Sequence, residues 1–95
     1  MIGKHVIVRS DKAGVFFGVL SDKNGTELTL TNVRKIYYWS GANTVEDLAL
    51  QGVKNPNNCK ITNFVEQIIL SSFDQILPCS EKAIVNLKQV FIWKA

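Results

Sequence analysis

The first part of the chain alternates apolar and polar residues in the way that strands do. Residues 6–10 and 15–20 are rich in β-branched and aromatic side chains, and residues 26–31 alternate with a period of two. Residues 33–40 form a further extended segment. The Asn-Gly pair at 24–25 favours a type I′ hairpin turn, because both central residues of that turn need positive φ. The pattern predicts four strands in an antiparallel meander.

Two short helices are predicted in the second part. Asn43 can cap the first, with Glu46 at its third helical position, and Gly52 stands where it ends. Ser80 can cap the second helix. Apolar residues spaced i, i+4, i+7 give that helix one stripe: Ala83, Leu87 and Val90.

The remaining segments are extended or irregular. Residues 53–58 read as an ordered loop, residues 60–70 as one strand, and residues 73–79 as extended chain interrupted by Pro78. In the strand over 60–70, alternation turns one set of side chains to the same face: Val65, Gln67 and Ile69. Residues 91–93 form a short strand or a docked tail. The order predicts an α+β fold: a small curled antiparallel β-sheet or open barrel with two short helices.

Composition limits the class of protein. The 95 residues are 46% hydrophobic and 20% charged, which fits a single domain over residues 1–95 and excludes a disordered tail or a coiled coil. No apolar run approaches the roughly 20 residues of a membrane span, and no secretory signal is visible, so no membrane association is expected. Cys59 and Cys79 are too few for an oxidised secreted scaffold. We expect a cytoplasmic protein with free thiols.

The net charge of +3 is mild and little clustered, since Arg34 and Lys35 form the one adjacent pair of cations. A dedicated nucleic-acid binder usually carries a basic stripe. The charge is compatible with a small phosphorylated ligand, and nucleic-acid binding is not the expected role. An ordinary solvated surface is the alternative interpretation.

Catalytic motifs are lacking in the sequence. His5 is the single histidine, the two cysteines do not have a zinc-ligand spacing, and neither a Walker loop nor a G-x-G-x-x-G motif occurs. Glu46 and Asp47 are adjacent acids in the first turn of a helix, where they stabilise its dipole. We therefore expect no enzyme, no metal and no cofactor.

The segment over residues 33–40 combines cations with aromatic rings. Alternation places Arg34 and Tyr38 on one face, and Lys35 and Trp39 on the other. Cations of this kind meet phosphate, and a flat ring stacks on a base. The segment thus predicts nucleotide binding, although tyrosine and tryptophan in a small sheet commonly fill the core instead.

A second polar cluster follows the first helix. Lys54 and Asn55 precede Asn57, Asn58 and Lys60, and asparagine amides can read a base edge or a ribose hydroxyl. The alternative is plain turn chemistry. Further candidates are on the first strand and at the terminus: Arg9, Trp93 and Lys94.

Several stretches resemble a family of short bacteriophage proteins known as a domain of unknown function. The similarity rests on residues 32–42, residues 48–56 and the Cys-Lys pair at 59–60, and the segments near both ends are also similar. Where that family commonly has a second arginine and a tryptophan, this chain has Lys35 and Tyr37. The resemblance implies a phage origin and expression in the bacterial cytoplasm.

Some unrelated groups of small phage proteins sequester nucleotide signals of antiviral systems such as Thoeris or CBASS. Small size, phage character and the cation–aromatic segment make a similar role, of the Lockin or Sequestin type, the leading hypothesis. In it Arg34 and Lys35 hold phosphate, and Tyr38 or Trp39 stacks on the base. The loop with Lys54 and Asn55 then closes the rim.

A sheet of this size leaves little room for an internal pocket, so the hypothesis includes a site shared between subunits of a homo-oligomer. The first alternative is a protein–protein interaction module that uses the same aromatic residues as anchors. A binder of single-stranded nucleic acid and a small hydrolase of the signal are the others.

Overall fold

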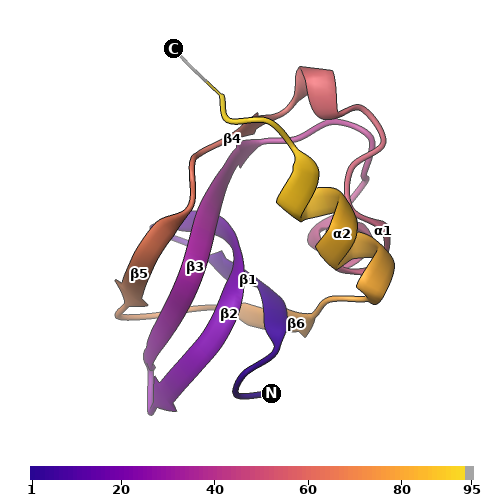
Figure 1. Cartoon of the computed structure of the whole chain (residues 1–95). Coiled ribbons are helices and arrows are strands. Elements are labelled where there is room, and N and C mark those ends of the chain that lie inside the picture. The colour runs from indigo at the N-terminus through magenta and orange to yellow at the C-terminus, as the bar shows by residue number, and fades with distance from the viewer. Residues whose placement is uncertain (94–95) are drawn as a thin grey trace.

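The computed structural model describes residues 1–93 (Figure 1). Within them the chain forms one antiparallel sheet of six strands, in the order β4-β3-β2-β1-β6 with β5 also paired to β3. The elements are β1 (His5–Ser10), β2 (Gly14–Asn24), β3 (Glu27–Tyr38), α1 (Val45–Gln51), η1 (Pro56–Asn58), β4 (Lys60–Ile61), β5 (Val65–Leu70), β6 (Gln75–Pro78) and α2 (Glu81–Gln89). This confirms the predicted α+β class.

The two extended segments predicted on either side of Asn32 are one strand, β3. Asn32 has a φ of 44° and stays within the strand as an irregularity. Asparagine tolerates this left-handed conformation, so the chain bulges here and does not turn away. The pairing with β2 shifts at this point, from Val19 opposite Thr31 to Phe17 opposite Arg34.

The hairpin between β2 and β3 lies where the Asn-Gly pair predicts it, but its turn type differs. Asn24 pairs with Glu27, so the central residues are Gly25 and Thr26. Of these, Gly25 alone has positive φ, at 64°. A type I′ turn needs positive φ at both central positions, and that prediction was wrong.

The cap of α1 is one residue later than predicted. Thr44, with extended backbone, accepts a hydrogen bond of 3.2 Å from the amide of Asp47. The Asp47 carboxylate in turn accepts one of 3.3 Å from the amide of Asn43. A capping box would need the Asp47 carboxylate to accept from the amide of Thr44, the cap residue itself, so the predicted box of Asn43 and Glu46 is replaced by a Thr44 cap with a carboxylate that reaches one residue further back.

The other predicted helix ends are confirmed. Gly52 ends α1 with a φ of 76°, and its amide donates to the carbonyl of Leu48. Ser80 caps α2 by accepting from the amide of Ala83.

The single strand predicted over residues 60–70 is divided into β4 and β5, which both pair with β3. Thr62 lies in the gap, where its amide donates to the carbonyl of Lys35 and its hydroxyl accepts from the Lys35 amide. Side-chain bonding thus replaces part of the regular ladder opposite Lys35.

The sheet has two apolar faces. Ile7, Phe17 and Ile36 on one face pack with Leu48 of α1 and Leu87 of α2. Both helices lie on this side in Figure 1. The other face curls over a second cluster: Val6, Val8, Phe16, Leu20, Leu28, Leu30, Val33 and Leu70.

After α2 the chain crosses back to β4, where the Trp93 amide donates to the carbonyl of Ile61 at 2.9 Å. Residues 91–93 are a docked tail, the second of the two predicted alternatives. Within residues 1–93, neither helix is long and apolar enough to cross a membrane.

Candidate functional site

Arg34 is buried between β3 and the end of α2, with an exposed fraction of 1%. Its Nε donates to the carbonyl of Thr62 at 2.9 Å, and its Nη1 donates to the carbonyls of Leu87 at 3.0 Å and Val90 at 2.8 Å. The Phe64 ring covers it at 4.7 Å. Burial lowers the pKa of the guanidinium, because the charge has lost water. The expected phosphate contact does not fit this geometry, because the guanidinium is buried: main-chain oxygens take Nε and Nη1, and Nη2 is enclosed without a hydrogen-bond partner within residues 1–93.

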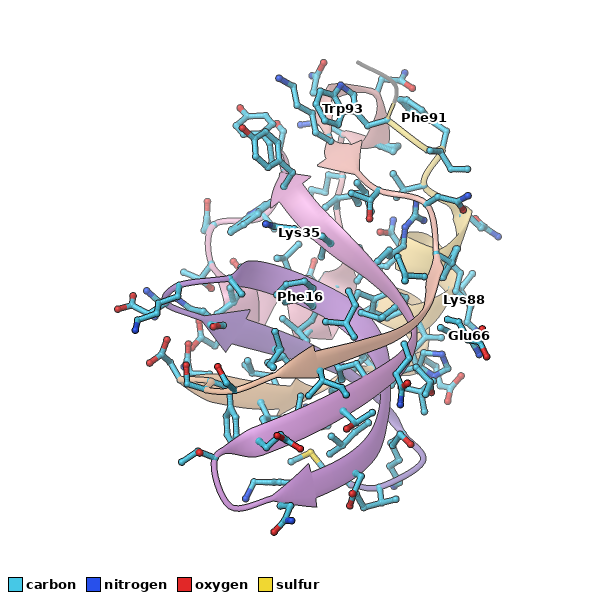
Figure 2. The ribbon with its side chains drawn as sticks, turned by 90° about the vertical axis from the view of Figure 1, so that its left-hand side faces the viewer. Phe16, Lys35, Glu66, Lys88, Phe91 and Trp93 are labelled. Carbon is cyan, nitrogen blue, oxygen red and sulfur yellow. The ribbon has the colours of Figure 1, made fainter. Side chains whose placement is uncertain are left out.

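Lys35 lies on the opposite face of the sheet. Its Nζ is 5.9 Å from the centre of the Phe16 ring, and both residues are labelled in Figure 2. Its stem crosses Gly14, where a β-carbon would be 3.0 Å from the Lys35 Cε. Arg34 and Lys35 therefore lie on opposite faces, as alternation predicts, and the sheet separates the two cations.

The two predicted aromatic residues have different environments. Tyr38 is 53% exposed at the end of β3. Trp39 is half-buried against the helix-covered core, and its Nε1 donates to the carbonyl of Ala42 at 3.2 Å. Of the two rings, that of Tyr38 is the more available to a ligand.

Lys54 and Asn55 pack against the loop that follows β3. A β-carbon on Gly41 would be 2.7 Å from the Lys54 amide nitrogen, so only glycine permits this close approach. The Asn55 side chain donates to the Ser40 hydroxyl at 3.4 Å. Lys54 borders a separate hollow beside Asp47, with a volume of about 440 Å³. These two residues thus support the loop more than they enclose the end of β3.

Aromatic side chains do gather where β3 meets the C-terminal tail. The Tyr37 and Trp93 rings stack with centres 5.6 Å apart and planes 9° apart. The Nζ of Lys60 is 5.2 Å from the Trp93 ring. Figure 2 shows Trp93 and Phe91 at this end of the molecule. We call this group the aromatic end: Tyr37, Tyr38, Lys60, Phe91 and Trp93.

A hollow of about 450 Å³ opens in the aromatic end. The rings of Tyr38, Phe91 and Trp93 border it. Lys60 supplies a cation, and the side-chain amides of two neighbouring asparagines supply hydrogen-bonding groups: Asn57 and Asn58. The described residues that border the hollow include no acid. Its volume is within the range of about 300–1,000 Å³ that small-molecule sites occupy.

The loop under this hollow is fixed by Cys59. Its buried thiol donates to the carbonyl of Asn55 at 3.3 Å, and its sulfur accepts from the amide of Ser40 at 3.4 Å. The second thiol is half-buried elsewhere, and burial raises the pKa of Cys79 to about 12. No group of three or more metal-ligating acids, histidines or cysteines occurs within residues 1–93.

Sequence reasoning identified part of this site. Asn57, Asn58, Lys60 and Trp93 were candidates, and the structure brings them together. The stack of Tyr37 on Trp93 was missed, because it joins residues that are far apart in the sequence. Lys94 lies outside the described residues.

Residues 3–87 match the family model described as Domain of unknown function (DUF6948), and the chain belongs to this family. No curated protein and no solved structure matches the chain.

Proposed function

We propose that the chain binds a small nucleotide at the aromatic end and sequesters it without cleaving it. The observation that carries the proposal is the position of Lys60, which lies 5.2 Å from the Trp93 ring at the border of the 450 Å³ hollow. A cation beside exposed rings suits a ligand that combines a flat base with phosphate.

The proposed roles follow from the side chains. Tyr38 or Trp93 stacks on the base, and Lys60 meets the phosphate. The amides of Asn57 and Asn58 bond to a base edge or ribose hydroxyl. These groups bind and orient a ligand, and they do not form the facing acid–base pair that general catalysis uses.

The phage resemblance extends the proposal to a biological role. Acting in the cytoplasm of an infected bacterium, the chain would be an anti-defence protein that removes a nucleotide immune signal, either ADP-ribose-derived or cyclic. It would act as a homo-oligomer.

A release experiment tests the binding proposal. The purified protein is incubated with candidate ADP-ribose-derived and cyclic nucleotides, separated from unbound material and denatured, and the released ligand is analysed. Intact nucleotide supports sequestration. Altered nucleotide indicates a hydrolase, and absence of retained nucleotide contradicts the proposal.

A protein–protein interaction module is the second candidate, because three rings of the aromatic end are exposed. The exposed fractions are 62% for Tyr37, 53% for Tyr38 and 50% for Phe91. Aromatic side chains of this kind anchor protein interfaces. Binding of a host or phage protein that is lost when Tyr38 and Phe91 become alanine, with no retained nucleotide, would favour this function.

A further inference from the structure

The strands that have a free side are not equally protected. β4 has two residues, and the carbonyl of its Ile61 takes the amide of Trp93. β6 has four residues and ends in Pro78, which has no amide hydrogen to donate. β5 has six residues, pairs with β3 along one side, and has no strand on the other side within residues 1–93. Figure 1 shows it at the left-hand edge of the sheet.

β5 lacks the features that usually keep an edge strand from pairing. Edge strands commonly carry lysine, proline or a bulge, or are very short. β5 has neither lysine nor proline, pairs with β3 in regular register, and holds Glu66 as its single charge. Two of its apolar side chains are exposed, Val65 by 45% and Ile69 by 58%.

We propose that β5 pairs with β5 of a second copy of this chain, antiparallel about a two-fold axis at Gln67. In this register Gln67 faces the partner subunit's Gln67, and Val65 faces the partner subunit's Ile69. Val65, Gln67 and Ile69 are all exposed, as alternation from the buried Leu70 requires. Each copy thereby covers the exposed apolar side chains of the other.

The register also agrees with the charge of the strand. Glu66 falls opposite the partner subunit's Ile68, so the two carboxylates do not stand directly opposite each other, where like charges destabilise a sheet. An axis at Ile68 would instead place Ile69 opposite the amide of the partner subunit's Gln67. The axis at Gln67 is favoured because it joins both exposed apolar pairs.

A second copy fits this edge better than an unrelated strand for a geometric reason. The two-fold axis places Val65 of each copy opposite the partner subunit's Ile69, so this apolar pair forms twice, and it leaves neither β5 edge unpaired. The sheet of one copy then continues through β3 and β5 into the partner's sheet. The assembly ends at two copies, because no β5 edge remains free. The proposal gives a structural form to the homo-oligomer of the proposed function, but it requires no nucleotide, so a failed dimer and a failed nucleotide-binding experiment are distinguishable.

Sedimentation equilibrium of the ligand-free protein tests the dimer. Ile69→Lys places a charge on the edge and is expected to weaken dimerisation at least tenfold. Val85→Lys is the matched control, because Val85 is 53% exposed on α2 and should leave the dimer intact. Monomer at all concentrations, open-ended larger species, or equal effects of the two variants would overturn the proposal.

Cysteine cross-linking tests the register independently of stability. Gln67→Cys should form an intermolecular disulfide under mild oxidation, because residues directly opposite on antiparallel strands are about 4.5–5.5 Å apart at Cα. Glu66→Cys should cross-link much less, since its partner position is displaced along the strand. Equal cross-linking of both variants, or none of Gln67→Cys, contradicts the assigned axis.

Discussion

The Nη1 atom of Arg34 donates a hydrogen bond of 2.8 Å to the carbonyl oxygen of Val90, 56 residues later in the chain. The same atom reaches Leu87, so a cation of β3 satisfies carbonyls at the end of α2 that have no helical partner. The tail that carries Phe91 and Trp93 begins directly after Val90. Arg34 therefore fixes the point from which the tail enters the aromatic end.

Replacing Arg34 by methionine should destabilise the fold. The substitution leaves the carbonyls of Thr62, Leu87 and Val90 without these donors, and hydrogen bonds to a charged group contribute about 1.5–3 kcal/mol each. We expect the free energy of unfolding in urea to fall by about 2–4 kcal/mol, less than the sum of three such bonds, because methionine also removes a buried charge whose Nη2 has no hydrogen-bond partner within residues 1–93. Lys35→Met is the control and should cost less than about 1 kcal/mol, since Lys35 makes a cation–π contact. Equal losses would contradict the role assigned to Arg34.

The burial of Arg34 shows where sequence reasoning stops. Alternation correctly separated Arg34 from Lys35, but it could not say which face would be covered. The answer depends on α2, whose carbonyls come from far along the chain. The bulge at Asn32 further shifts the pairing with β2. Local rules cannot anticipate such contacts, because they arise when distant elements pack.

Features that depend on short-range residue patterns were predicted more accurately than contacts between distant elements. Ser80, Gly52 and the two strands at the start of the chain were predicted from residue types whose effects act within a few positions. Some residues of the aromatic end were predicted, but the contacts that bring them together were not. Lys60 and Trp93 were both candidates, but nothing local indicates that the tail returns to β4.

Gly52 should not tolerate alanine. A β-carbon there would overlap the Asn86 side chain, which bonds to the amide and carbonyl of Val53 at 2.8 and 2.9 Å. Gly52 also has a φ of 76°, which strains other residues. We expect Gly52→Ala to lower the free energy of unfolding by about 2 kcal/mol or more, measured in urea. In the background of Asn86→Ala the same change should cost less, because the overlap is relieved; an equal cost would contradict the steric part of the explanation.

The stability of the protein should fall in mild acid through His5. Burial lowers the pKa of His5 from 6.5, and the charge of Lys88 lowers it further, while Glu81 acts in the opposite direction. The unfolded chain therefore binds more protons than the folded one as the pH drops below 6.5, and stability decreases with falling pH.

Urea unfolding between pH 7.5 and pH 5 measures this effect. The loss on acidification should be smaller in His5→Gln, which cannot take up the proton. Because His5 also stacks on Phe17 at 5.5 Å, the variant is expected to lose some stability at every pH, and only the pH-dependent part bears on the prediction. An unchanged pH dependence would show that other groups cause it.

The aromatic end can be tested residue by residue once a retained nucleotide is identified. Trp93→Ala removes a ring bordering the hollow, and stacking on a base contributes about 1–3 kcal/mol, so the Kd should rise about 5- to 150-fold. Lys60→Ala should also weaken binding, and it should reduce the dependence of the Kd on salt, because the proposed phosphate contact is lost. Isothermal titration calorimetry measures both.

Lys35→Ala is the matched control for Lys60→Ala. It removes the same charge and a similar cation–π contact, but the contact is with Phe16, and Lys35 does not border the hollow. Lys35→Ala should therefore leave the Kd within about twofold, because Lys35 does not border the hollow and makes none of the proposed ligand contacts. If Lys35→Ala weakens binding as much as Lys60→Ala, the ligand is attracted by net charge and not held at the aromatic end. If Lys35→Ala alone weakens it, the nucleotide lies against the other face of β3.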